Sequence, residues 1–140
     1  MKKACIDSGV LDIYFSMNRS EKVKSLMDNV ARRNVSAQVV KPVLSEVFFH
    51  LCKTRGAPEA TIQLKNLLDN YPIELVDLDR DLLFSAGKLR CQHASTLSYI
   101  DCMSIAYCLD SGAEFHTTEK KIKQIPHNTL ARLSIVTYTW

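Results

Sequence analysis

Four of the fifteen acidic residues occupy positions that suit a chemical role better than a solvated surface. They are Asp7, Glu46, Asp101 and Glu119. Carboxylates that lie close together repel one another unless a cation neutralises them. A site whose ligands are all oxygen atoms favours Mg²⁺ or Mn²⁺ over zinc. If the fold gathers these four side chains, the sequence predicts a site for one of these two cations.

Each acid also has an ordinary structural interpretation, and we keep these alternatives open. Asp7 directly precedes an expected helix, where Asp is a common N-cap. Glu46 and Glu119 could be first-turn acids that face water and interact favourably with the helix dipole. Ser98 and Asp101 fit the S-x-x-D capping box, which would satisfy the Asp101 carboxylate in an otherwise apolar helix. A capping role and a metal-binding role are compatible.

The elements that would position these acids alternate along the chain. Hydrophobic patterns, Pro and Gly predict strands over residues 3–7, 37–40, 73–76, 113–117 and 133–138. They predict helices over residues 10–15, 21–33, 42–54, 58–71, 79–89 and 98–111, with a short turn near residue 120. Alternation of this kind predicts a three-layer α/β/α fold with a small, mostly parallel sheet. Ligands bind such sheets at the carboxyl ends of the strands, where all four acids would lie.

The composition of the chain is that of an ordinary globular protein. Its 140 residues fit one domain over residues 1–140. No apolar run approaches the roughly 20 residues that span a bilayer, and the N-terminus does not read as a signal peptide, so we expect a cytoplasmic protein. The net charge of +3 indicates a polyanionic partner only weakly. Five cysteines without C-x-x-C spacing predict free, mostly buried thiols, and the four histidines lack metal-ligand spacing and are expected to be structural.

The ordered set of motifs resembles the PIN-domain ribonucleases, especially the small toxins of bacterial and archaeal toxin–antitoxin pairs. The matching segments are Ile6-Asp7-Ser8, Ser45-Glu46-Val47-Phe48, Ser98-Tyr99-Ile100-Asp101 and Thr117-Thr118-Glu119. Their order and spacing match over nearly the whole chain, although no single motif is specific. The main departure is Glu119, since the family more often has Asp at this position.

The resemblance implies a function and a set of residues that perform it. It implies a Mg²⁺- or Mn²⁺-dependent endoribonuclease whose metal is bound by the four acids, with Ser8, Ser98 and Thr117 as supporting hydroxyl groups. It also implies an RNA substrate, a small antitoxin partner and a homodimer. Positive side chains that could hold RNA phosphates are Lys41, Lys120, Lys121 and Lys123, although a run of lysines is equally typical of a solvated surface.

Two other functions remain open from the sequence. The Glu119 departure is compatible with a catalytically degenerate PIN-like module that binds nucleic acid or another protein. A phosphoryl-transfer enzyme could use Asp7 as its nucleophile, because aspartyl-phosphate chemistry places an Asp after the first strand. Such enzymes usually show D-x-D, and the residue two positions after Asp7 is Gly9.

Overall fold

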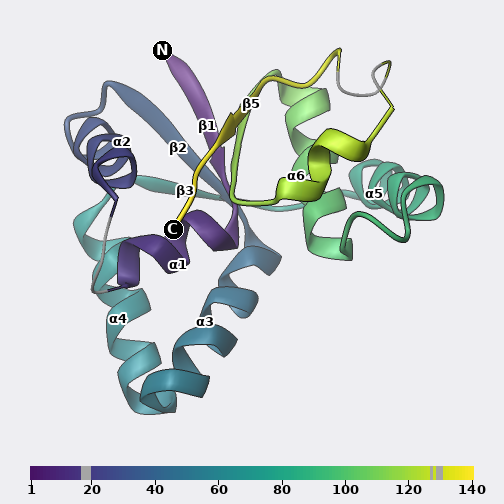
Figure 1. Ribbon diagram of the computed structural model, residues 1–140. Helices are drawn as coiled ribbons and strands as arrows, with labels where there is room; N and C mark the ends of the chain where they lie inside the picture. Colours follow the sequence, from purple (N-terminus) through teal and green to yellow (C-terminus); the bar gives the residue numbers. More distant parts are fainter. Residues whose placement is uncertain (17–19, 127, 129–130) are drawn as a thin grey trace.

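The computed structural model describes residues 1–16, 20–126, 128 and 131–140, with Lys123 described by its backbone alone. The predictions that fall elsewhere, for His127 and for the side chain of Lys123, lie outside the described residues. Figure 1 shows how the elements are arranged.

A parallel five-stranded sheet forms the centre of the described fold. Its strands are β1 (Lys2–Ile6), β2 (Val35–Val40), β3 (Ile73–Val76), β4 (Glu114–Thr117) and β5 (Ile135–Thr137), in the spatial order β3-β2-β1-β4-β5. All four pairings are parallel, so every described strand has its carboxyl end at the same edge. The five predicted strands are therefore confirmed. The last is shorter than predicted because β5 lies at the edge of the sheet and pairs only with the end of β4.

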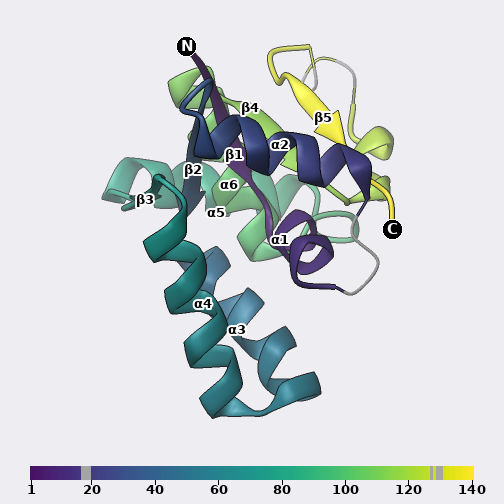
Figure 2. The same cartoon turned by 90° about the vertical axis from the view of Figure 1, so that its left-hand side faces the viewer.

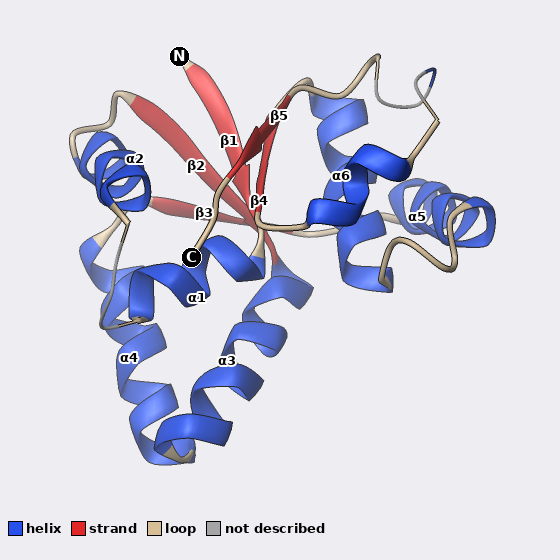
Figure 3. Ribbon diagram, in the orientation of Figure 1, coloured by secondary structure: helices blue, strands red, loops and turns tan. Residues whose placement is uncertain are grey.

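The α-helices cover both faces of the sheet, as the predicted three-layer fold requires. They are α1 (Ser8–Phe15), α2 (Glu21–Ala31), α3 (Lys41–Arg55), α4 (Ala57–Asn70), α5 (Arg80–Gln92) and α6 (Tyr99–Ser111), with a 3-10 helix η1 (Lys120–Gln124). Figures 1 and 3 show α1 and α2 on one side of the sheet and α5 and α6 on the other. Figure 2 shows α3 and α4 extending together from one end of the sheet. None of the described helices is long and apolar enough to cross a membrane.

The boundaries of α3 differ slightly from the prediction. The helix begins at Lys41, one residue early, because Pro42 is tolerated in the first turn, where its missing N–H is not needed. Glu46 therefore lies in the second turn, and its interpretation as a first-turn acid is wrong. Gly56, at a positive φ of 86°, separates α3 from α4 as expected.

The buried core surrounds the central strand and fixes the site above it. Ala4, Cys5 and Ile6 of β1 are completely buried between the helical layers, and so is Phe115 of β4. Because β1 is hydrogen-bonded to β2 and β4, the ends of these three strands are rigidly related. All five cysteines are free, and Cys91 alone among them is exposed, which agrees with the expected reduced, mostly buried thiols.

Candidate functional site

Asp7 occupies the junction between β1 and α1 at the centre of the sheet edge. It caps α1, as the alternative interpretation expected, and its Oδ1 accepts a hydrogen bond of 2.8 Å from the Ser8 amide. Its Oδ2 accepts one of 3.0 Å from Thr117 Oγ1, at the end of β4. The side chain is only 4% exposed. Burial, and next the neighbouring charge of Asp101, raise the Asp7 pKa to about 7, so this carboxylate is held where ionisation is costly.

Asp101 approaches the same edge from the first turn of α6. The expected capping box is present, since Ser98 Oγ accepts from the Asp101 amide at 3.1 Å and Asp101 Oδ2 accepts from the Ser98 amide at 3.2 Å. Burial, and also the charges of Glu119 and Glu46, raise the pKa of the Asp101 carboxyl group, although hydrogen bonding from Ser98 lowers it. The cap therefore orients Asp101 without removing the electrostatic cost of its ionised form.

Glu46 on α3 and Glu119 in the loop after β4 complete the set, and both are partly exposed. Glu46 Oε1 accepts a short hydrogen bond from the Ser8 hydroxyl. Glu119 is the N-cap of η1 and not a first-turn acid, which corrects its alternative interpretation. Its Oε1 accepts from the Lys121 amide at 2.9 Å, while its own amide donates to Thr117 Oγ1 at 3.0 Å.

One cavity of about 350 Å³ receives all four acids. It is lined by Asp7, Ser8, Gly9, Asp12, Glu46, His50, Ser98, Asp101, Thr118, Glu119 and Trp140. The sequence predicted three supporting hydroxyl groups, and two of them, Ser8 and Ser98, line this cavity. The third, Thr117, is buried and donates a hydrogen bond to Asp7. Lys41, Lys120 and Lys121 are not among the described residues that line the cavity. Lys41 instead pairs with Asp77 at 2.6 Å, and Lys120 lines a smaller pocket beside Thr118 and Glu119.

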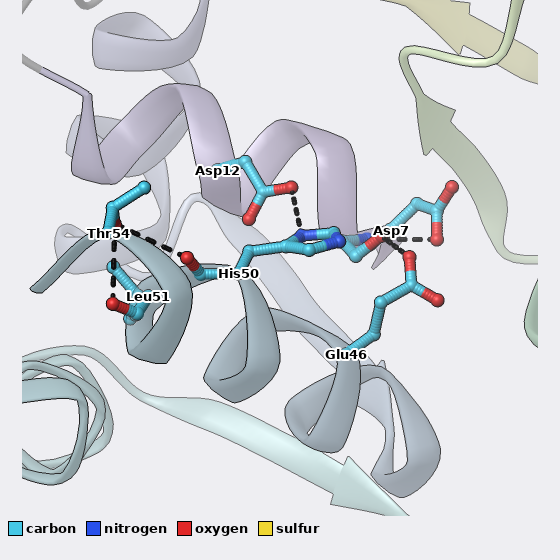
Figure 4. Close-up of polar contacts among 7 residues, drawn as sticks. Asp7, Asp12, Glu46, His50, Leu51 and Thr54 are labelled. Atoms are coloured by element: carbon cyan, nitrogen blue, oxygen red, sulfur yellow. Dashed lines mark hydrogen bonds and ion pairs between the residues drawn. The ribbon is translucent and has the colours of Figure 1, made fainter. Parts of the chain in front are cut away.

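Three lining residues were not singled out from the sequence: Asp12, His50 and Trp140. Figure 4 shows the His50 side chain reaching from α3 toward Asp12, on the same side of the helix as Glu46. His50 Nδ1 lies 2.7 Å from Asp12 Oδ2, so His50, which we expected to be structural, contacts a second residue that lines the cavity. A helical spacing of four joins Glu46 to His50, and this spacing was the available signal.

Gly9 allows α1 to approach the loop that carries Glu119. A Cβ atom on Gly9 would lie 1.9 Å from Thr118 Oγ1, which is too short for a real contact, and 3.0 Å from Thr118 Cβ, which is unusually tight. A side chain at position 9 would therefore force Thr118 to move, and glycine fits the packing of the cavity wall without this displacement.

The donor chemistry of the cavity fits a hard divalent cation. Its four gathered acids offer carboxylate oxygens, which Mg²⁺ and Mn²⁺ prefer. Burial, and next the repulsion between the acids, raise the pKa of Asp7 and Asp101, and a bound cation would offset both effects. Within the described part of the chain, however, no three His, Cys, Asp or Glu side chains already form a finished metal-binding group. Direct ligation by three or more of the acids therefore requires side-chain movement.

Comparison with known proteins identifies the family. The model of the PIN domain matches residues 4–128, which is most of the chain. The chain belongs to the PIN-domain family. A sequence search of curated proteins found no match.

Solved structures share the PIN fold at low sequence identity. VapBC2 from Rickettsia felis, bound to a promoter DNA fragment, aligns with a TM-score of 0.72 and 16% identity over 98% of this chain and 99% of that one. DNA-bound VapBC from Salmonella typhimurium aligns with a TM-score of 0.70 and 16% identity, over 99% of this chain and 100% of that one. VapC20 from Mycobacterium tuberculosis, described as a sarcin-ricin loop cleaving toxin, aligns with a TM-score of 0.63 and 16% identity, over 79% of this chain and 85% of that one. This likeness supports the fold that the sequence predicted.

Proposed function

We propose that this PIN domain is a metal-dependent endoribonuclease that hydrolyses RNA phosphodiester bonds. The observation that carries the proposal is the convergence of Asp7, Glu46, Asp101 and Glu119 on one cavity at the carboxyl edge of the sheet. These residues come from four separate segments of the chain, so a shared surface location by chance is a poor explanation. Two of the four, Asp7 and Asp101, are buried at an electrostatic cost that a bound cation would offset.

In a nuclease of this kind, the residues of the cavity would have three roles, which are metal binding, support of the metal ligands and RNA binding. Asp7 and Asp101 are the fixed ligands, since each is oriented by hydrogen bonds from neighbouring residues. Glu46, oriented by the Ser8 hydroxyl, and Glu119 bind from the more exposed sides. When bound, Mg²⁺ or Mn²⁺ polarises the phosphodiester and lowers the pKa of a bound water. Ser98 and Thr117 support the ligands, while Lys120 and Lys121 are exposed directly after Glu119 and would hold RNA phosphates.

We further propose that the protein is the toxin of a toxin–antitoxin pair. The support is that solved structures with this fold include a toxin–antitoxin complex from Klebsiella pneumoniae and VapC20 from Mycobacterium tuberculosis, which is described as a toxin. A small antitoxin is then the expected partner, and a homodimer in the cytoplasm is the expected assembly. Residues 1–140 would act as one nuclease domain. Lys41, which pairs with Asp77, would have to leave that partner to contact RNA.

The experiment is cleavage of a structured RNA with Mg²⁺ or Mn²⁺ by the wild type and by Asp7→Asn and Asp101→Asn. We expect each substitution to lower the rate at least about 100-fold, since removing one charged group from a preorganised catalytic site costs that much. Asp69→Asn, an exposed acid on α4, is the matched control and should cut normally. Equal rates for all four proteins, or cleavage that persists in EDTA, would show that the assignment is wrong.

A catalytically degenerate, nucleic-acid-binding PIN module is the second candidate. The observation that favours it is that the Glu119 carboxylate is already bonded to the Lys121 amide, in a cavity without a finished metal-binding group among the described residues. Calorimetric titration with Mn²⁺ separates the two functions. Binding that is lost in Asp101→Asn supports the nuclease, whereas RNA binding without any effect of Mn²⁺ supports the module.

A further inference from the structure

A second, more apolar groove continues the acidic cavity along α1 and α3. It has a volume of about 530 Å³ and is lined by Asp12, Phe15, Ser16, His50, Leu51, Thr54, Arg55 and Trp140. Three of these residues, Asp12, His50 and Trp140, also line the acidic cavity. The two hollows are therefore adjacent, and Asp12, His50 and Trp140 form their shared wall. The groove alone is within the usual size range of small-ligand sites.

The charge of the lining residues changes at His50. Five carboxylates line the acidic cavity, and among its described lining residues His50 is the single side chain able to carry a positive charge. Beyond it, the groove adds Arg55, whose Nη2 donates to the Phe15 carbonyl at 2.6 Å and whose side chain is exposed. A polyanion that reaches the cavity would meet its first positive groups along this groove.

Asp12 holds His50 in a defined orientation. The Asp12 carboxylate is half-buried, and its Oδ2 lies 2.7 Å from Nδ1 of His50. Figure 4 shows the two side chains and this contact. Nε2 makes no hydrogen bond to any described residue and is left for a ligand. A phosphate on the Nε2 side would place the imidazole ring between two anions, Asp12 and the phosphate, each within reach of one ring nitrogen. Asp12 is thus a positioning residue for His50.

Trp140 offers a flat apolar surface in the same shared wall. Its side chain is 74% exposed, although it lines both hollows, so most of the indole faces outward. The ring of Phe15 lies in the wall of the same groove. Unpaired RNA bases stack on aromatic side chains of this kind.

We propose that this groove binds the RNA nucleotide next to the cleaved bond, with its phosphate on His50 and its base on Trp140. The proposal rests on the proposed ribonuclease function. An RNA strand that is cut inside the cavity must continue beyond it on both sides of the cleaved bond. The groove lies next to the cavity, so it can hold the nucleotide on one of these sides. A peptide segment could also enter an apolar groove, but the Arg55 guanidinium, the His50 ring nitrogen Nε2 and the exposed indole together match a nucleotide better.

Trp140 is the only tryptophan of the chain, so its fluorescence reports directly on the groove. The binding protein is Asp101→Asn, which retains the groove and is not expected to cut, and the probe is a single-stranded RNA octamer of mixed sequence. We expect RNA to quench Trp140 emission with a saturable curve. In that background, His50→Gln and Asp12→Asn should each raise the Kd about tenfold, and the combination should add little, because Asp12 acts through His50.

Cleavage by otherwise wild-type protein supplies the second readout. His50→Gln and Trp140→Leu should raise KM about tenfold and leave kcat within about twofold, while Phe84→Leu, which removes an exposed aromatic ring on α5, should change neither. Unchanged KM values in both variants, or RNA binding seen by anisotropy without a change in Trp140 emission, would overturn the proposal and leave the groove to a protein partner. Failure of the ribonuclease function is distinguishable, since the wild type would then not cut RNA at all.

Discussion

Replacing Asp7 with Asn should stabilise the metal-free protein while abolishing cleavage. Asp7 is 4% exposed, and its pKa of about 7 in the folded protein compares with 3.8 for an unperturbed group. The difference corresponds to about 4 kcal/mol of ionisation cost in the folded state above pH 7. Asn avoids this cost, but it accepts the hydrogen bonds from Ser8 and Thr117 less well, and this loss offsets about 2 kcal/mol.

The sign of the pH dependence follows from the raised pKa. Between about pH 4 and pH 7 the folded protein keeps the Asp7 proton that the unfolded chain has lost, so this group lowers the stability as the pH rises through that window. The advantage of Asp7→Asn should therefore grow by about 2–3 kcal/mol between pH 5 and pH 8. The weaker hydrogen bonds of the Asp7→Asn side chain change the free energy of unfolding by nearly the same amount at pH 5 and pH 8. They therefore cancel when the two pH values are compared.

Urea unfolding in EDTA at pH 5, 6, 7 and 8 measures this difference for the wild type, Asp7→Asn and the exposed control Asp69→Asn. The control should follow the wild type at every pH. If the free energies of unfolding of Asp7→Asn and the wild type differ by the same amount at pH 5 and pH 8, or if the variant is weaker at pH 8, Asp7 is not held in the costly environment described above.

Three other perturbations test the cavity. Saturating Mn²⁺, at about 100 times its Kd, should stabilise the wild type at pH 8 by about 2.7 kcal/mol and Asp7→Asn much less, which thermal melts with and without EDTA can measure. Gly9→Ala should cost about 1–3 kcal/mol in urea unfolding and reduce cleavage, because the new methyl group overlaps Thr118; an unchanged midpoint would contradict the packing argument. Ser98→Ala removes the acceptor for the Asp101 amide and should lower the free energy of unfolding by about 1 kcal/mol. Calorimetry should also show a measurable loss of Mn²⁺ affinity. If the variant keeps both its stability and its Mn²⁺ affinity, the cap does not position Asp101.

Much of the fold could be predicted from local patterns. The apolar runs of the strands, Pro42 near the start of α3 and Gly112 at the end of α6 each mark a boundary through backbone geometry, and such signals are local. The sheet order was not predictable in this way, because a strand's neighbours depend on contacts between distant segments. The parallel direction of the strands was predictable, since helices separate them.

In the site, too, contacts between residues close in sequence could be predicted, whereas contacts between distant segments could not. The capping role of Asp7 and the Ser98–Asp101 box are encoded within a few residues, and both are confirmed. The pairing of Asp12 with His50 joins α1 to α3 across 38 positions, and no local pattern marks it. The contact of Gly9 with Thr118 is equally distant in sequence. The role of the four acids as metal ligands stays a prediction.

The central place of β1 has a consequence for when the cavity can exist during synthesis. Asp7 precedes its partner Thr117 by 110 positions, and the acid Glu119 follows in the loop after β4. Contacts between β1 and β4 form late, because β4 must be made before it can pair with β1. A growing chain therefore lacks its complete set of four acids until β4 and the loop that carries Glu119 have been translated.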